Sequence, residues 1–202
     1  MARDAIKDFR VNLISILSSS ISEFDDDKIS EAANMIYDAL KTSNRVHITG
    51  IGKPGDLAHY LAASFSSVGI PAYHLDGTEV VHGSCGQLAP GDVVIFISNS
   101  GNTAEMKIGF NAVKDMQVKT IGVTGNPNSF LAKESDLALI AAVKKEGGPL
   151  NLAPRASILA EAAILQAVSV GVQTLCNFKP EDFHLRHKSG ALGEMLAKTK
   201  LF

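Results

Sequence analysis

The strongest chemical signal is a cluster of hydroxyl and amide side chains between a very apolar stretch, residues 93–97, and a helical pattern that begins near Glu105. Its polar members and its glycine are Ser98, Asn99, Ser100, Gly101 and Thr103. A helix N-terminus offers free N–H groups and a partial positive charge, glycine permits close backbone approach, and hydroxyls add neutral donors. The segment therefore predicts a phosphate-binding loop, although an ordinary strand-to-helix turn capped by Ser or Thr has the same spacing.

A second glycine-bearing loop, Gly50-Ile51-Gly52-Lys53-Pro54-Gly55, follows the first β-branched stretch. Its third glycine is misplaced for a dinucleotide-binding loop, and Pro54 after Lys53 excludes a Walker A loop, which needs Ser or Thr there. Two interpretations of Lys53 stay open: an ammonium group in a ligand crevice, or a solvated lysine beside a helix whose first turn holds Pro54. Gly52 is a further candidate for contact with a ligand.

The elements that must position these loops follow from the spacing of apolar residues. Two amphipathic helices are predicted at about residues 3–41, and the acidic run Asp25–Asp27 supplies a cap for the second. Strong strand patterns lie at 45–49, 93–97 and 119–123, and weaker ones at 72–75 and 137–140. Helical stretches alternate with these strands, and Ala156–Leu175 is predicted as one buried helix.

This alternation predicts a doubly wound α/β fold, in which helices cover both faces of a parallel sheet. Ligands of such folds bind beyond the carboxyl ends of the strands, where both glycine-bearing loops are expected. A length of 202 residues suits one domain over 1–202.

The composition bounds the class of protein. A content of 46% hydrophobic and 20% charged residues is typical of a globular chain. The net charge of -2, without a basic block, argues against nucleic acid as a partner. Apolar stretches are broken by charge or glycine before the roughly 20 residues of a membrane span, and the N-terminus lacks a secretion signal, so we expect a cytoplasmic protein. Cys85 and Cys176 are expected to be free thiols.

Motifs in a fixed order also give the sequence a resemblance to a known family. They are Gly50–Lys53, Val81–Gly83, Ile97–Gly101, Lys145–Pro154 and His187–Gly193. Together they resemble the sugar isomerase (SIS) domain family, most closely the arabinose 5-phosphate isomerases, from about residue 30 to the C-terminus.

The resemblance implies a flavodoxin-like, five-stranded parallel sheet flanked by helices, a homodimer or homotetramer, and aldose–ketose isomerisation of a sugar phosphate without a cofactor. Many arabinose 5-phosphate isomerases also carry a C-terminal pair of CBS domains, which this sequence does not include. Regulation through CBS domains is therefore expected to be absent.

By the match of motifs, the active-site residues of the family fall on Lys53, His82, Glu105, Glu146 and His187. Isomerisation through an enediol needs a group that moves a proton between neighbouring carbons and a shuttle between the two oxygens. Glu146 is the candidate carbon base, its pKa tuned by partial burial, and His187 is the candidate for ring opening or for the hydroxyl proton. In the family this histidine is thought to enter the neighbouring subunit's site, so His187 is expected to act in trans.

The other roles are less distinctive. His82 is predicted to contact sugar hydroxyls and Glu105 to orient Lys53 or the sugar, but a loop histidine is often only hydrogen-bonded in place, and a carboxylate suits any first helical turn. Without the resemblance, Glu146 would be taken as a surface carboxylate and His187 as a packing histidine. No ligand triad stands out, so no metal is predicted.

Departures from the family pattern leave the sugar open. After Leu-Ala-Pro, where arabinose 5-phosphate isomerases commonly have a Thr/Ser-rich stretch, the sequence has Arg155-Ala156-Ser157-Ile158. Arg155, by bidentate phosphate binding or by pairing with an acidic neighbour, and Ser157 are candidate substrate contacts. We expect arabinose 5-phosphate and ribulose 5-phosphate, or a close analogue, as the substrate pair. The rival class is a non-catalytic phosphosugar sensor, which would not need Glu146 together with His187.

Overall fold

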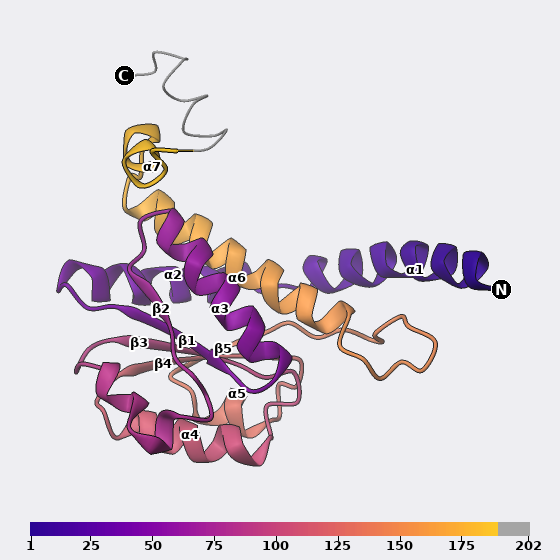
Figure 1. Cartoon of the computed structure of the whole chain (residues 1–202), viewed down its shortest axis with the longest axis horizontal. Coiled ribbons are helices and arrows are strands. Elements are labelled where there is room, and N and C mark those ends of the chain that lie inside the picture. The colour runs from indigo at the N-terminus through magenta and orange to yellow at the C-terminus, as the bar shows by residue number, and fades with distance from the viewer. Residues whose placement is uncertain (190–202) are drawn as a thin grey trace.

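The computed structural model describes residues 1–189, which form a central sheet surrounded by helices (Figure 1). In chain order the elements are α1 (Ala2–Ser22), α2 (Asp26–Lys41), β1 (Val46–Gly50), α3 (Lys53–Ser67), β2 (Ala72–His74), the 3₁₀ helices η1 (Val80–His82) and η2 (Ser84–Gln87), β3 (Val93–Ile97), α4 (Ala104–Lys114), β4 (Lys119–Thr124), α5 (Phe130–Glu134), β5 (Leu137–Ile140), α6 (Ala156–Leu175) and α7 (Pro180–Arg186). The predicted strands and helices are confirmed, with strand ends shifted by one residue at most. Residues 190–193 of the last sequence motif lie outside the described part of the chain.

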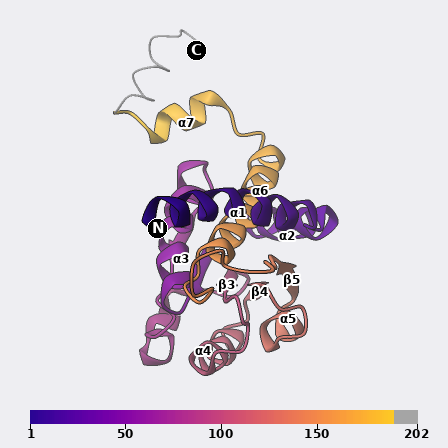
Figure 2. The same ribbon diagram turned by 90° about the vertical axis from the view of Figure 1, so that its right-hand side faces the viewer.

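The five strands are all parallel and lie in the order β2-β1-β3-β4-β5. From β1 the chain moves to β2 on one side and then crosses to β3 on the other, so the winding direction reverses between β1 and β3. Helices α2, α3 and α6 cover one face of the sheet and α4 and α5 cover the other (Figures 1 and 2). The doubly wound α/β fold is therefore confirmed, and its ligand crevice is expected at the carboxyl ends of β1 and β3.

Two hydrophobic clusters hold the helices to the sheet. Alternate residues of β3 enter different clusters: Val93, Ile95 and Ile97 pack on the side of α2, α3 and α6, whereas Val94 and Phe96 pack on the side of α4 and α5. All five residues of β3 are buried. Burial on both faces explains why 93–97 is a continuous apolar run instead of an alternating pattern.

Helices α2 and α6 pack against each other in the layer over one face of the sheet. The acidic run caps α2 as predicted, because the Asp25 carboxylate accepts a 3.0 Å hydrogen bond from the Lys28 N–H. Helix α6 is the one helix of the described residues long and apolar enough to cross a membrane, with a mean hydropathy of 1.5. Its inner face contributes Ile164, Leu165 and Val168 to the core beside α2 and α3, so we interpret it as a core helix.

Helix α1 extends outward from the sheet and its covering helices (Figure 1). Its buried residues, Ile16 and Ser20, lie in its second half, where it contacts α6. Its first half carries exposed apolar side chains at Ile6, Val11 and Ile14. This exposed apolar face has no partner among the described residues of the chain.

A buried polar network lies at the amino ends of β1 and β3. Asp92 and His47 are each 1% exposed, and His47 Nε2 lies 3.1 Å from Asp92 Oδ2. The carboxylate also accepts hydrogen bonds from the Ala89 N–H (3.0 Å), the Arg45 N–H (2.9 Å) and Asn44 Nδ2 (3.1 Å). Burial alone would raise the pKa of Asp92, but these hydrogen bonds outweigh it and lower the pKa, so the ionised carboxylate joins the two strand starts.

Replacing Asp92 with Asn should therefore destabilise the fold. The amide cannot accept all of these hydrogen bonds, and we expect a loss of about 2–4 kcal/mol in the free energy of unfolding, measured by urea denaturation at pH 7. Because the folded-state pKa of Asp92 is lowered, its contribution is present above the unfolded pKa and is lost as the pH falls through the folded one. The difference between the two proteins should shrink in acid.

Asp38→Asn provides the matched control, because the Asp38 carboxylate forms only an exposed ion pair with Lys41. Its denaturation midpoint should stay close to that of the wild type. Equal stability of the Asp92→Asn variant and the wild type at pH 7 would contradict this role of Asp92.

Candidate active site

Two loops leave neighbouring strands at the switch point, where a doubly wound fold is expected to bind its ligand. Gly50, the last residue of β1, pairs with Ile97, the last residue of β3, so the loops after them start side by side. One loop leads into α3 on one face of the sheet and the other into α4 on the opposite face (Figure 1). Two helix N-termini, each with free N–H groups and a partial positive charge, therefore begin at the same crevice.

The β3–α4 loop is shaped by its own hydrogen bonds. Ser98 is 7% exposed, and its carbonyl and Oγ both accept from the Gly101 N–H, at 3.0 and 3.2 Å. Gly101 has a φ of +61°, and a Cβ there would lie 2.8 Å from Thr124 Oγ1, so this tight turn requires glycine. The Asn99 carbonyl accepts hydrogen bonds from β4 and its following loop. Ser98, Asn99 and Gly101 thus fix the conformation of the loop.

Ser100 and Thr103 are the residues of this loop whose hydroxyls are available to a ligand. Ser100 is exposed and its Oγ accepts only a long, 3.3 Å hydrogen bond from the Asn102 N–H. Thr103 stands at the N-cap of α4, yet its side chain makes no capping hydrogen bond. The start of α4 and two hydroxyls therefore form an unsatisfied set of donors suited to an anion.

The β1–α3 loop places a cation at the start of α3. Gly52, with a φ of +67°, is the N-cap of α3, and Lys53 is the first residue of that helix. The Lys53 side chain is exposed and forms no ion pair with any residue between 1 and 189. An ammonium group without a carboxylate partner beside two helix N-termini is consistent with an anionic ligand.

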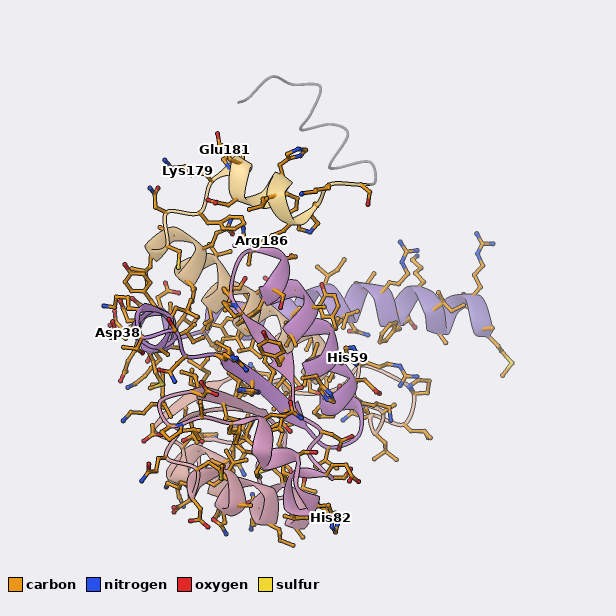
Figure 3. All side chains as sticks on the ribbon, turned by 60° about the vertical axis from the view of Figure 1, so that its left-hand side comes forward. Asp38, His59, His82, Lys179, Glu181 and Arg186 are labelled. Carbon is orange, nitrogen blue, oxygen red and sulfur yellow. The ribbon has the colours of Figure 1, made fainter. Side chains whose placement is uncertain are left out.

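Glu105 and His82 are both exposed. Glu105 lies in the first turn of α4. His82 ends η1, which contacts α4 through Val80 and Gly109, and Figure 3 shows its ring at the outer edge of the molecule. Neither side chain is held by a hydrogen bond within the described residues, so the chain leaves both orientations unfixed.

Glu146 has a specific structural setting that the sequence did not indicate. Its Oε2 accepts hydrogen bonds from three backbone N–H groups at the start of α6, those of Arg155 (2.6 Å), Ala156 (2.8 Å) and Ser157 (3.1 Å). Its own N–H donates to Asn151 Oδ1 at 2.7 Å. Burial would raise the pKa of Glu146, but the nearby Ser157 hydroxyl and the N–H groups of the helix start outweigh it and lower the pKa. Glu146 is therefore an ionised cap of α6, with Oε1 accepting none of the three N–H groups.

His187 lies far from Glu146 within the chain. It follows α7, its ring stacks on Phe183 with centroids 3.9 Å apart, and Nδ1 lies 3.0 Å from the Phe183 carbonyl oxygen. Glu146 caps the start of α6, and α7 follows its end; a helix of this length spans about 30 Å (Figure 1). One chain does not bring these two candidate residues together.

The two candidate substrate contacts after Leu-Ala-Pro, Arg155 and Ser157, lie at the start of α6. The Arg155 guanidinium lies over the ring of Phe9 of α1, 5.9 Å from its centroid, and forms no ion pair within the described chain. Ser157 is 1% exposed, so its side chain is buried beneath the start of α6 instead of facing the crevice. Its backbone N–H donates a hydrogen bond to Glu146, whereas its hydroxyl oxygen has no hydrogen-bond partner within the described residues.

The structure also shows polar groups that sequence reasoning missed. A cavity of about 210 Å³ beside the start of α3 is lined by residues that include Asp56, His59, His74 and Asp76. His59 and His74 stack there with ring centroids 5.3 Å apart, and Figure 3 shows His59 at the surface of α3. No cluster of three or more potential ligands suited to a metal ion is found among residues 1–189. The second missed residue is Glu161, the one acidic residue in the apolar helix α6, which its sequence pattern alone could have indicated.

Comparisons with known proteins agree on the origin of this fold. The SIS domain profile matches residues 39–170. The arabinose 5-phosphate isomerase KdsD of Francisella tularensis is 35% identical over 96% of this chain and 58% of its own length, so the chain spans little more than half of that curated relative. A solved Escherichia coli CFT073 structure in complex with A5P is 37% identical, with a TM-score of 0.80 over 90% of this chain and 95% of its own. A putative sugar-phosphate isomerase of Listeria monocytogenes is 31% identical, with a TM-score of 0.84 over 94% of this chain and 100% of its own. The crevice between two helix starts, the ordered motifs and these similarities lead to one conclusion: the chain belongs to the SIS domain family.

Proposed function

We propose that this protein isomerises a sugar phosphate between its aldose and ketose forms through an enediol. The observation that carries the proposal is that α3 and α4 start beyond neighbouring strand ends, with a Lys53 ammonium group that forms no ion pair within residues 1–189. Its relatives named as arabinose 5-phosphate isomerases, and the related structure in complex with A5P, support arabinose 5-phosphate and ribulose 5-phosphate as the substrate pair. The reaction needs no cofactor in this proposal, and a cytoplasmic site of action is assumed.

In this proposal the terminal phosphate binds the Ser100 and Thr103 hydroxyls and the N–H groups at the start of α4. Lys53, at the start of α3, would stabilise the phosphate or the negative oxygen of the enediolate with its charge. Glu105, in the first turn of α4, would orient Lys53 or a sugar hydroxyl, and His82 would contact a hydroxyl group.

Glu146 is the proposed carbon base. Oε1 would take the proton from the carbon next to the aldose carbonyl, which leaves an enediol, and would return it to the former carbonyl carbon. His187 would move the proton between the two oxygens. Because the helix start holds Glu146 ionised, this base is available at neutral pH, and its placement contributes more than its basicity.

The separation of Glu146 and His187 supports a site shared between subunits. Within one chain these residues lie beyond opposite ends of α6, so a second copy would have to supply His187. The exposed apolar residues of α1 offer surface for such association. We therefore propose a homodimer or homotetramer as the active form.

The phosphate site is tested by removing the available hydroxyls. Ser100→Ala and Thr103→Ala should each weaken binding of arabinose 5-phosphate by about tenfold or more, because each removes a hydrogen bond to a charged group. Binding of unphosphorylated arabinose should not change, as titration calorimetry would show. Ser30→Ala, an exposed serine of α2, is the control. Unchanged affinity in both crevice variants would place the phosphate elsewhere.

The role of Glu146 is tested by Glu146→Gln. The amide oxygen can still accept hydrogen bonds from the start of α6, so the variant should fold, but without a basic carboxylate the turnover should fall about a hundredfold or more. In deuterated water the wild type should incorporate deuterium at the carbon next to the carbonyl. The lowered pKa of Glu146 also implies that its protonation reduces kcat/KM only below the usual pH range of glutamic acid.

Glu31→Gln, at an exposed position of α2, serves as the control for this substitution. A folded Glu146→Gln variant with full activity would exclude Glu146 as the carbon base.

The shared site is tested by complementation. His187→Ala and Glu146→Gln subunits, each inactive alone, should regain part of the activity when they are dissociated and reassembled together, because some sites then hold both intact residues. Hybrid formation is checked with two distinguishable affinity tags. Hybrids that form without any return of activity would show that each site is contained within one chain.

A further inference from the structure

Glu161 is a carboxyl group inside the hydrophobic core. It lies in the second turn of α6, on the face whose neighbours Ala160, Ile164 and Leu165 belong to the core cluster. The residue is 1% exposed, and Oε1 is buried without a hydrogen-bond partner in the described structure. A buried polar atom without a partner is unfavourable by itself, so a specific role is expected.

Ser157 connects Glu161 to the candidate base. It precedes Glu161 by four residues, so the two side chains lie on the same face of α6. Its backbone N–H donates to Glu146 Oε2 at 3.1 Å, and its hydroxyl lies close enough to the carboxylate to contribute to lowering the pKa of Glu146. Ser157 Oγ nevertheless makes no hydrogen bond of ordinary geometry within the described residues. Ser157 Oγ and Glu161 Oε1 are thus two buried oxygens near Glu146 that have no hydrogen-bond partner within the described residues.

The charge state of Glu161 follows from its surroundings. Burial, and then the negative charge of Glu146, raise the pKa of Glu161 to about 8. The charged side chains of the elements packed around α6 are all exposed to solvent, and none of them is a cause named for this shift. They are Arg3, Asp4, Lys7, Asp8 and Arg10 of α1, Asp26, Asp27, Lys28, Glu31, Asp38 and Lys41 of α2, Lys53, Asp56 and His59 of α3, and Lys144 and Lys145 before Glu146. At neutral pH Glu161 is therefore a neutral acid beside an ionised one.

We propose that Glu161 is a positioning residue that holds Glu146 at the start of α6 through a buried hydrogen-bond chain. The Glu161 carboxyl group donates to Ser157 Oγ, and the Ser157 hydroxyl then donates to the Glu146 carboxylate. Both links would be closed by rotation of the Ser157 and Glu161 side chains, which share one face of α6. The effect of these hydrogen bonds on catalysis rests on the proposed function of Glu146. The hydrogen bonds themselves do not depend on that function.

The donor and acceptor roles within this hydrogen-bond chain depend on whether Glu161 is protonated. When Glu161 is ionised, it becomes an acceptor and competes with Glu146 for the Ser157 hydroxyl. The two carboxylates also repel each other, which weakens the hold of the helix start on Glu146. The structure thus links the placement of the candidate base to the protonation of a residue that no substrate can reach.

The coupling between the protonation of Glu161 and the charge of Glu146 is tested first by a measurement that does not depend on enzymatic activity. The full-length wild type is titrated by infrared spectroscopy in deuterated water, with the band of protonated carboxyl groups as the signal. One such group should titrate near pH 8 and be missing in Glu161→Gln. In Glu146→Gln the midpoint of this titration should fall, because the repelling charge has been removed. Absence of the group, or a midpoint unchanged by Glu146→Gln, would overturn the proposal.

Thermal unfolding gives a second readout of the same coupling. The folded-state pKa of Glu161 is raised above the unfolded value, so its stabilising contribution is complete below the unfolded pKa and is lost as the pH rises through the folded one. Glu161→Gln should therefore gain Tm relative to the wild type, by several degrees, between pH 5 and pH 8. A difference in Tm that is the same at every pH would contradict the buried acid.

The effect on positioning is then measured with arabinose 5-phosphate. The glutamine of Glu161→Gln can donate to Ser157 as the neutral acid does, so its kcat should fall much less near pH 7 than that of Glu161→Ala, which has no donor. Above pH 8 the wild type should lose kcat through Glu161 ionisation, and Glu161→Gln should lack this loss. Ser169→Ala, which removes another buried hydroxyl of α6, is the control.

The outcomes separate the two proposals. If the protein shows no isomerase activity but its two carboxyl groups are coupled as described, the proposed function is wrong and the buried hydrogen-bond chain stands. An active isomerase whose Glu161→Gln and Glu161→Ala variants have identical kcat and pH profiles would remove the positioning role and keep the function.

Discussion

The start of α6 sets the constraint on which the candidate site depends. The first N–H groups of a helix have no acceptor within the helix, and Arg155, which stands at the N-cap position, offers no side-chain cap. The Glu146 carboxylate accepts three of these groups and is further favoured by the helix dipole. The loop that returns from β5 therefore supplies the side-chain oxygen that accepts these N–H groups where α6 begins. A capping residue and a proposed catalytic base are then the same side chain.

The use of Glu146 both as a helix cap and as the proposed base affects its base strength. A general base is most effective when its pKa lies near the working pH, and the hydrogen bonds that hold Glu146 move its pKa in the opposite direction. The proposed reaction must then gain more from placement, and from stabilisation of negative charge by Lys53 and the helix starts, than from base strength. Glu161 fits the same logic, because a hydrophobic residue there would be expected to stabilise the core better than a buried acid. Its presence is explained if the placement of Glu146 matters more than the stability that is given up.

The fold could be predicted from the sequence because its signals are local. The continuous apolar run at 93–97 and the long alanine-rich stretch 156–175 match β3 and α6 at both ends, and the Asp25 cap was foreseen. The sequence also singled out the β3–α4 loop, for which phosphate binding stays a proposal. The roles of its residues could not be separated from the sequence, because only the folded turn shows that Ser98 is buried and that the Ser100 and Thr103 hydroxyls are available. The contacts of Glu146 with residues 155–157 and of His47 with Asp92 join positions distant in sequence, and no periodicity records such pairs. Arg155 was expected at a phosphate or an acidic partner, whereas it lies over Phe9, an aromatic residue of a helix whose position relative to the loop could not be foreseen.

The length of α6 connects the architecture to the question of assembly. A straight helix of 20 residues holds its two ends about 30 Å apart, and no change of side-chain conformation shortens that distance. The same helix is fixed on its inner face by the core, so it cannot swing to bring α7 to the crevice without exposing Ile164, Leu165 and Val168. A reaction that needs both Glu146 and His187 within one chain would therefore require α7 to leave the position it has in this structure. Either the histidine has no part in the chemistry, or the crevice is completed by a second copy, and the unpartnered apolar side chains on the first half of α1 favour the second alternative.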